Sequence, residues 1–239
     1  MLCIFGMRLI LTIVACMILR FGVIEKDVEA GAGSIEAEDL VNAEWVSRLE
    51  VSKQTNQIIV VAVEDTHATL SFYEQENNVW REVLKTEACI GKNGIGKVRE
   101  GDNRTPIGVF RFITAFGILE NPGTQLEYVQ VDQTHYWVDD DTSTYYNQFV
   151  STREVQMDWE SAEHLCEYGQ LYHYVLALDY NKERVKGAGS AIFLHCNQEK
   201  SKATAGCIAI PETYMREIIK RVEEECVIII DTSDGVKKY

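Results

Sequence analysis

Hydrophobic and polar residues alternate along much of the chain between residues 57 and 231, a pattern that predicts strands rather than helices. The run QIIVVAVE, Gln57–Glu64, is rich in β-branched residues and typical of a buried strand. Residues 68–91 alternate, break at Glu76-Asn77-Asn78 and alternate again, which predicts a hairpin. Further strands are predicted at 105–117, 127–131, 135–138, 172–179, 191–197, 207–210 and 227–231.

Helical spacing is confined to short stretches. One helix is predicted near 36–49, and a second after Asp158, which is placed to cap the sequence WESAEHLCEYG. A third begins at Pro211 and runs through PETYMREIIKRVEEE, with Met215, Ile218, Ile219 and Val222 on one face. No Pro- or Ser-rich linker interrupts residues 51–239. We therefore predict one mainly β domain of mixed sheets, sandwich-like or barrel-like, with a few peripheral helices.

The first 24 residues are apolar except for Arg8, Arg20 and a few small polar positions, and Leu9–Leu19 is the uninterrupted part. This length is typical of a signal-peptide core. Residues 1–24 are accordingly predicted to be a signal peptide or an N-terminal membrane anchor, and a buried helix is the alternative. Ala15 before Cys16 resembles a lipoprotein processing site, so lipidation at Cys16 is a further possibility. Residues 25–50 are read as an acidic tether with a short helix, and the protein is expected to be exported.

Charge and composition narrow the function classes. The net charge is −14 and the isoelectric point is near 4.8, so the chain does not present the cationic surface that nucleic-acid binding requires. Contact with a membrane is expected only through the N-terminal segment. Beyond that segment the chain carries five cysteines, an odd number, so at least one thiol is expected to be unpaired.

A histidine and a cysteine stand close together near the C-terminal end. SAIFLHCN is predicted to be a strand, so His195 and Cys196 point to opposite faces and Cys196 faces the core. The polar stretch NQEKSKA suggests a hairpin-like return to the small-residue turn Thr204-Ala205-Gly206. Such a return brings His195 and Cys207 together across adjacent strands.

A thiol beside an imidazole is the arrangement that nucleophilic catalysis needs. His195 can accept the thiol proton of Cys207 and return it to a leaving amine. Backbone N–H groups at Gly206 and Cys207 can stabilise the oxyanion of a tetrahedral intermediate. The alternative from spacing alone is two structural cysteines and one satisfied histidine on sheet strands. Zinc binding is disfavoured, because no second ligand pair has the spacing for it.

Two sequence blocks resemble the YkuD-type L,D-transpeptidase catalytic domain. One is VREGDNRTPIGVFRF, 98–112, which is similar to the family's segment Lys/Arg-x-x-Gly-x-x-x-Thr-Pro-x-Gly-x-Phe. The other is IFLHCNQEKSKATAGCIAIPE, which is similar to its His-to-Gly-Cys block. With GKNGIGK, 91–97, the resemblance extends over roughly 57–231. It implies a YkuD-like fold, Cys207 as nucleophile, His195 as general base and Gly206 as an oxyanion donor.

The chain departs from the family pattern beside the nucleophile. Ala205 stands where many members have histidine, and Ala209 where they often have Arg or Asn. Substrate contacts are expected at Tyr136, Trp137, Thr204 and Ala205. The aromatic segment 128–174, with Asp139, Asp140 and Asp141, is read either as a lid whose acids bind the amine of a stem peptide or as a satellite core with a solvated turn.

The resemblance implies an exported peptidoglycan L,D-transpeptidase of cell-wall biogenesis and cell shape. It implies a cysteine acyl-enzyme, no metal or organic cofactor, and stem peptides as partners of a monomeric enzyme. The alternatives are an L,D-carboxypeptidase that uses the same Cys–His pair with water as acceptor, and a non-catalytic cell-wall-binding module.

Overall fold

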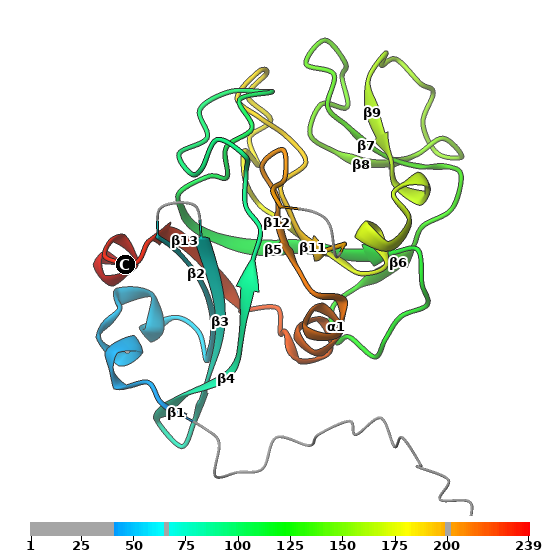
Figure 1. Cartoon of the computed structure of the whole chain (residues 1–239). Helices are drawn as coiled ribbons and strands as arrows, with labels where there is room; N and C mark the ends of the chain where they lie inside the picture. Colours follow the sequence, from blue (N-terminus) through cyan, green and yellow to red (C-terminus); the bar gives the residue numbers. More distant parts are fainter. Residues whose placement is uncertain (1–40, 65–66, 199–201) are drawn as a thin grey trace, which may run out of the picture. The chain divides into compact units, whose positions relative to one another are not determined.

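The computed structural model describes residues 41–64, 67–198 and 202–239, and these residues form one β-rich unit (Figure 1). Most described elements are strands: β1 Val41–Asn42, β2 Gln57–Glu64, β3 His67–Glu76, β4 Val79–Ala88, β5 Gly108–Gly117, β6 Tyr128–Gln130, β7 His135–Val138, β8 Phe149–Ser151, β9 Ala162–His164, β10 Val175–Leu178, β11 Phe193–Cys196, β12 Ile208–Ile210 and β13 Val227–Thr232. The α-helix α1 spans Glu212–Arg221, and short 3₁₀ helices are η1 Glu44–Arg48, η2 Glu50–Lys53, η3 Leu165–Glu167, η4 Gly169–Tyr172 and η5 Gly235–Lys238.

The main sheet is mixed and nearly closes into a barrel. Its strand order is β1-β4-β3-β2-β13-β5-β10-β11-β12, and β6 pairs with β5 beside this path. An antiparallel bridge between Cys89, just after β4, and Ala209 in β12 joins two segments that are far apart in the strand order. Strand β12 therefore has neighbours on both sides, β11 and the segment after β4.

The β3–β4 hairpin follows the sequence pattern closely. Its two turn residues, Asn77 and Asn78, have φ values of 50° and 63°. A two-residue hairpin turn with positive φ at both positions matches the right-handed twist of its strands, and asparagine adopts that conformation more readily than most residues.

Alternation along each strand separates two sides of the main sheet. Ile59 and Val61 of β2 face a large apolar core that also holds Leu194 of β11 and Ile218 of α1. Ile58 and Val60 face the opposite side, where η1, η2 and η5 cover them with a second apolar cluster. The apolar spacing of α1 thus packs against strands, as the sequence predicted.

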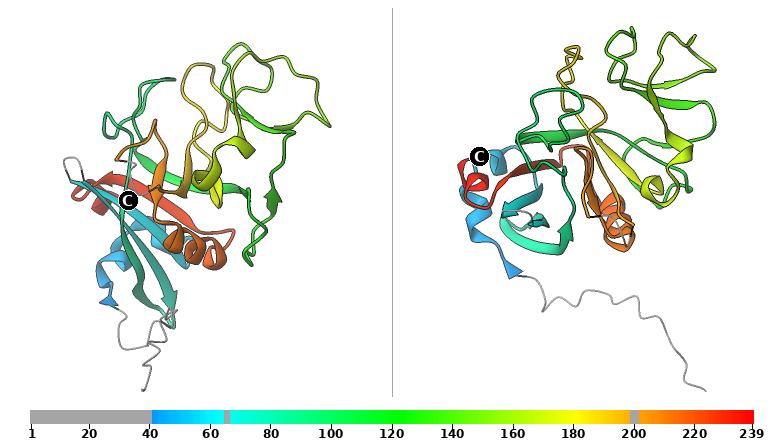
Figure 2. Two further views of the ribbon diagram at one scale, coloured as in Figure 1. Left: turned by 45° about the vertical axis from the view of Figure 1, so that its right-hand side comes forward. Right: turned by 45° about the horizontal axis from the view of Figure 1, so that its top comes forward.

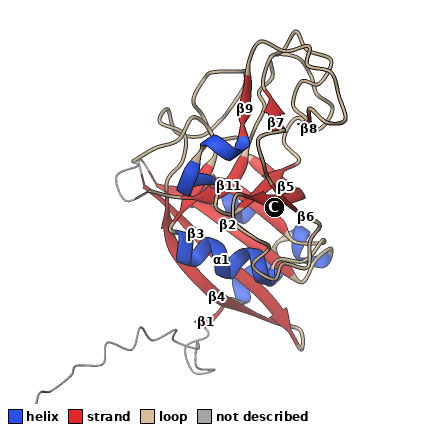
Figure 3. Ribbon diagram, turned by 90° about the vertical axis from the view of Figure 1, so that its right-hand side faces the viewer, coloured by secondary structure: helices blue, strands red, loops and turns tan. Residues whose placement is uncertain are grey.

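A small sheet of order β8-β7-β9 lies at one end of the main sheet (Figures 2 and 3). Together with η3 and η4 it contributes Trp137, Leu165 and Tyr172 to a third apolar cluster. From the main sheet this cluster takes Phe116 of β5, Phe193 of β11 and Cys207. The nucleophile predicted from sequence is therefore packed on the side of the sheet that faces the small sheet.

The strands predicted for 57–64, 105–117, 135–138 and 227–231 are confirmed, as is the helix that begins after Pro211, although it ends at Arg221. The helix predicted after Asp158 is wrong. The Asp158 carboxylate accepts hydrogen bonds from Ser143 and Thr144 instead of capping a helix. Residues 162–164 form β9, which pairs with β7, and only 3₁₀ turns follow.

Two other predictions are corrected. The described part of the 36–49 helix forms β1 and the 3₁₀ helix η1, and residues 36–40 lie outside the described residues. The hairpin-like return between His195 and Cys207 is wrong, because β11 and β12 run parallel. The predicted leader, 1–24, also lies outside the described residues. Within the described ranges, no helix combines the length and apolar character needed to cross a bilayer.

Candidate active site

His195 and Cys207 lie on the same side of two neighbouring parallel strands. Leu194 is paired with Ile208, so Cys207 lies beside Phe193 and diagonally from His195. Cys196 points to the opposite side and is fully buried in the large core, as predicted. Strand alternation therefore places His195 and Cys207 on one side of the sheet, although β11 and β12 pair in parallel.

The Cys207 thiol is held by two backbone groups of the segment before and within β11. It donates a hydrogen bond to the Ala191 carbonyl at 3.2 Å, and its Sγ accepts one from the Phe193 N–H at 3.4 Å. Burial raises the pKa of Cys207 well above its usual value, and the nearby Glu163 carboxylate raises it further. The Phe193 N–H and the Lys97 ammonium lower it in part. At neutral pH the resting group is therefore a thiol.

The His195 imidazole is fixed by backbone carbonyls. Nδ1 lies 2.7 Å from the Cys196 carbonyl oxygen, which can only accept, so this geometry assigns the hydrogen to Nδ1 and leaves Nε2 as the basic nitrogen. Burial lowers the pKa of His195 to about 4, although the carbonyls of Cys196 and Leu171 favour the protonated ring. The resting imidazole is therefore neutral at pH 7.

Tyr172 lies against the imidazole and connects it to Glu163. The Tyr172 ring meets His195 edge-on, with centroids 5.5 Å apart, and its hydroxyl donates a short hydrogen bond to Glu163. Burial raises the pKa of Glu163 to about 7, and the charges of Asp139 and Glu100 add to this shift. A titratable carboxylate thus lies close to the Cys–His pair on the side of the small sheet.

The turn before Cys207 is organised by threonine hydroxyls. The Thr204 hydroxyl donates to the Cys207 carbonyl at 2.6 Å and accepts from the Gly206 N–H at 3.1 Å. The buried Thr105 hydroxyl approaches the same Cys207 carbonyl at 3.5 Å and accepts from the Gly91 N–H at 2.8 Å. Through Thr105, the upstream Thr-Pro block and the cysteine block meet at Cys207.

These hydrogen bonds bear on the predicted oxyanion donors. The Gly206 N–H is occupied by Thr204, whereas no acceptor within the described residues is bonded to the Cys207 N–H. Gly206 has φ of +154°, and a Cβ there would lie 3.0 Å from the Arg104 carbonyl oxygen. Glycine is required at this position by both its conformation and the close approach of the Arg104 backbone.

Comparison with known families follows this geometry. The model of the YkuD family, the L,D-transpeptidase catalytic domain, matches residues 56–230. The chain belongs to this family. Enzymes of the YkuD family act on peptidoglycan stem peptides outside the cytoplasm. The resemblance noted in the sequence is confirmed, as is the mainly β YkuD-like fold.

The chain is also similar to several solved structures at low identity. Bd1075 of Bdellovibrio bacteriovorus is 15% identical with a TM-score of 0.43, and the match covers 83% of this chain and 58% of that one. Pgp2, the helical cell shape determining protein of Campylobacter jejuni, is 14% identical with a TM-score of 0.40, and the match covers 79% of this chain and 54% of that one. An L,D-transpeptidase of Enterococcus faecium is 14% identical with a TM-score of 0.37, and the match covers 74% of this chain and 50% of that one. This chain thus matches between 50% and 58% of the length of these solved chains. No curated protein is significantly similar to it.

The residues predicted to contact substrate in this YkuD domain fall in different environments. Ala205 is exposed and Thr204 half-buried at the nucleophile turn. Tyr136 is half-buried and stacks on His164, with ring centroids 4.4 Å apart. Trp137 is 2% exposed, donates its indole N–H to Asn147 and packs on Phe193. Trp137 therefore supports the site from behind Phe193, while Tyr136 lies on the opposite side of β7.

The acidic run and the remaining cysteines are also placed. Asp140 accepts hydrogen bonds from Thr142 and Glu160, whereas one oxygen of the half-buried Asp139 has no hydrogen-bond partner. Cys166, Cys196 and Cys226 are free thiols, as is Cys207. Within the described ranges, no three His, Cys, Asp or Glu side chains are grouped to hold a metal ion.

Sequence reasoning missed several groups of this site. Glu163 was missed because 158–169 reads as a helix, whereas the β7–β9 pairing places it in a strand and its charge acts on Cys207. Tyr172 was noted only as one of the aromatic residues of the segment 128–174. Lys97 was noted only within the segment GKNGIGK. Its burial depends on contacts with residues far away in the chain, and no periodic pattern signals it.

Proposed function

We propose that this YkuD-family domain is a peptidoglycan L,D-transpeptidase in which Cys207 is the nucleophile and His195 the general base. The observation that carries the proposal is the placement of both side chains on one side of neighbouring parallel strands, with the imidazole anchored through Nδ1 to Cys196. This anchoring leaves Nε2 to accept a proton. The Ala205 and Ala209 substitutions leave both reacting side chains in place.

The reaction begins from a neutral pair. The thiol turns from the Ala191 carbonyl toward His195, Nε2 takes the proton, and sulfur attacks the carbonyl between the L-centre and the terminal D-residue of a tetrapeptide stem. The carbonyl π electrons move to oxygen, where the Cys207 N–H stabilises the oxyanion. As the carbonyl re-forms, the C–N bond breaks and His195 returns its proton to the leaving amine. A thioester remains on Cys207.

The second half-reaction reverses this sequence with a new nucleophile. The amine of a neighbouring stem attacks the thioester, gives a proton to His195, and the C–S bond breaks with return of the proton to sulfur. Thr204 and Gly206 shape the turn that presents the cysteine. The exposed Ala205 and the half-buried Tyr136 are the proposed substrate contacts. Trp137 is proposed to act through Phe193.

Location and assembly belong to the same proposal. We infer an exported enzyme that works as a monomer in the cell wall, with residues 1–24 as leader or anchor, 25–50 as tether and 51–239 as catalytic domain. Its acidic charge disfavours a nucleic-acid partner.

The testing experiment uses protein without residues 1–24, mixed with a disaccharide-tetrapeptide and followed by mass spectrometry of muropeptides and enzyme. Cross-linked dimer and a transient acyl adduct on Cys207 are expected, and Cys207→Ala should abolish both. Tripeptide with the same adduct but without dimer would identify the carboxypeptidase instead. Full turnover by Cys207→Ala would refute the assigned nucleophile, and an absence of adduct and product from a reduced Cys207 would indicate a wall-binding module.

A further inference from the structure

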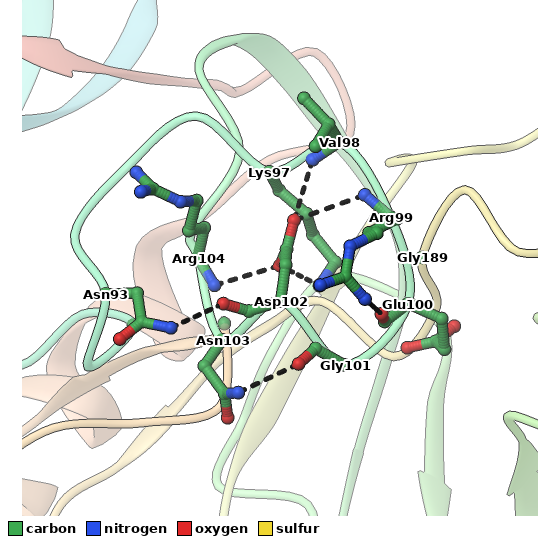
Figure 4. Close-up of polar contacts among 12 residues, drawn as sticks. Asn93, Lys97, Val98, Arg99, Glu100, Gly101, Asp102, Asn103, Arg104 and Gly189 are labelled. Atoms are coloured by element: carbon green, nitrogen blue, oxygen red, sulfur yellow. Dashed lines mark hydrogen bonds and ion pairs between the residues drawn. The ribbon is translucent and has the colours of Figure 1, made fainter.

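A buried lysine lies beneath the nucleophile turn. The Lys97 side chain is 2% exposed and its Nζ lies 3.1 Å from Asp102 Oδ1, whose side chain is 7% exposed. Asp102 also accepts hydrogen bonds from the backbone N–H groups of Val98, Arg99 and Arg104 (Figure 4). Burial alone would raise the pKa of Asp102, but these four donors lower it well below its usual value. The Asp102 carboxylate is therefore ionised across the physiological pH range.

The ammonium is aimed at the residue before the cysteine. Nζ lies 3.6 Å from the position that a Cβ on Gly206 would take, and the lysine stem passes against Gly189. Two glycines thus leave the space that the lysine fills. An ammonium has three N–H groups, and within the described residues Asp102 is the acceptor that faces it. A buried cation with spare donors beside a nucleophile is suited to negative charge that develops during the reaction.

A carboxylate acts on Cys207 in the opposite sense. Glu163 opposes negative charge on Cys207, whereas Lys97 favours it. The titratable side chains of Tyr168 and Tyr172 also lie near the thiol, and His195 packs on Tyr172. Glu163 is held by Tyr172 on the side of the small sheet, and Lys97 by Asp102 on the side of the 91–105 loop. The nucleophile lies between these two opposite charges.

We propose that Lys97 is a positioning residue of the Cys207 centre, whose buried ammonium, locked by Asp102 against Gly206, stabilises negative charge on sulfur and on the acyl oxygen. The inference rests on the proposed role of Cys207 as nucleophile and extends it. Lys97 acts through space and through the turn, without contact to the reacting atoms. An exposed lysine would be screened by water and salt, so burial is what makes the position effective.

The test measures how fast iodoacetamide, an uncharged reagent, alkylates Cys207 as a function of pH, with the modified cysteine identified by peptide mass spectrometry. Lys97→Met is expected to slow alkylation about tenfold at pH 7.5 and to move the profile to higher pH, since one pKa unit changes the thiolate fraction about tenfold. Lys97→Arg should stay near the wild-type rate. Glu163→Gln, which keeps an acceptor for Tyr172, should move the profile to lower pH and speed alkylation.

Two controls separate charge from structure. Lys92→Met removes an exposed lysine of the same loop and should leave the profile unchanged. The double variant Lys97→Met with Asp102→Asn avoids an unpaired buried carboxylate and should reproduce the slower profile if Lys97→Met alone does not fold. A folded Lys97→Met protein, or the double variant, with the wild-type profile would overturn the proposal. Slower alkylation in both Lys97→Met and Glu163→Gln would also overturn the proposal. A purely structural role changes the alkylation rate in the same direction in both variants, whereas loss of the two opposite charges changes it in opposite directions.

Failure of this inference is distinguishable from failure of the proposed function. Alkylation reports the thiol of Cys207 whether or not the protein turns over stem peptides. Opposite shifts in the two variants, with no acyl transfer by the wild-type protein, would support Lys97 and refute the transpeptidase. Acyl transfer that depends on Cys207 but not on Lys97, with unshifted alkylation, would support the transpeptidase and refute the role of Lys97.

Discussion

The Tyr172 ring lies edge-on against the His195 imidazole, with their centroids 5.5 Å apart, while its hydroxyl donates to Glu163. One tyrosine thus connects the predicted general base to a carboxylate on the neighbouring small sheet. Because both rings are almost fully buried, the contact fixes the plane of the imidazole as well as excluding water from it.

Replacing Tyr172 separates packing from hydrogen bonding. Tyr172→Phe keeps the ring and is expected to fold with a moderate loss of kcat, because Glu163 loses its donor. Tyr172→Ala also removes the ring and should lower the free energy of unfolding by about 3–5 kcal/mol. Urea unfolding and steady-state kinetics on both variants measure the two effects. Equal stability of the Ala and Phe variants would contradict the packing role.

The buried histidine predicts a pH dependence of stability. The pKa of His195 is about 4 in the folded protein against 6.5 for the free group, so protonation favours the unfolded chain. The corresponding stability is present above pH 6.5 and is lost as pH falls from 6.5 toward 4, by about 3 kcal/mol. Urea unfolding of the wild type and His195→Gln across this range checks the sign, since the variant should lack this component. Parallel curves for the two proteins would exclude it.

Gly206 is expected not to tolerate a side chain. Gly206→Ala places a Cβ 3.0 Å from the Arg104 carbonyl oxygen at a φ of +154°, and should cost about 1–3 kcal/mol and most of the activity. Gly123→Ala is the matched control, because its φ is +105° but no atom lies within 4 Å of the new Cβ. Thermal unfolding and acyl-adduct formation are the measurements. Similar losses of activity in both variants would show that crowding at Gly206 is not the cause.

Thr204 is expected to act on the nucleophile turn rather than on the fold. Thr204→Val removes the hydroxyl that bonds both the Cys207 carbonyl and the Gly206 N–H, so adduct formation should slow by about tenfold while stability falls by about 1 kcal/mol. Thr204→Ser retains the hydroxyl and should recover most of the rate. Stopped-flow measurement of acylation compares them, and a serine variant as slow as valine would mean that the methyl group matters instead.

Strand alternation made much of the fold predictable from sequence. QIIVVAVE forms β2 at the predicted boundaries, and Asn77-Asn78 turns the hairpin, because both depend on local properties of the chain. The opposite orientation of His195 and Cys196 follows from the same alternation. The helix predicted for WESAEHL is wrong because this stretch, despite its helix-like spacing, pairs with β7. That contact joins segments some 25 residues apart in the chain.

The site itself was predictable only in part. His195 and Cys207 stand out because they occur with a strand and a small-residue turn, and the family match places both within its range. The parallel pairing of β11 and β12 was missed, since the polar stretch between them is compatible with either direction. Lys97 and Glu163 were missed because their proximity to Cys207 arises from tertiary packing alone.

The bond between Thr105 and Cys207 spans 102 residues of chain, and the bridge between Cys89 and Ala209 spans a similar distance. Contacts between such distant segments require closure of long loops, which costs conformational entropy. The turn that presents the thiol is thus completed only when both halves of the domain have come together. A partly unfolded chain has the cysteine but not its surroundings, so the proposed acyl transfer requires the whole domain.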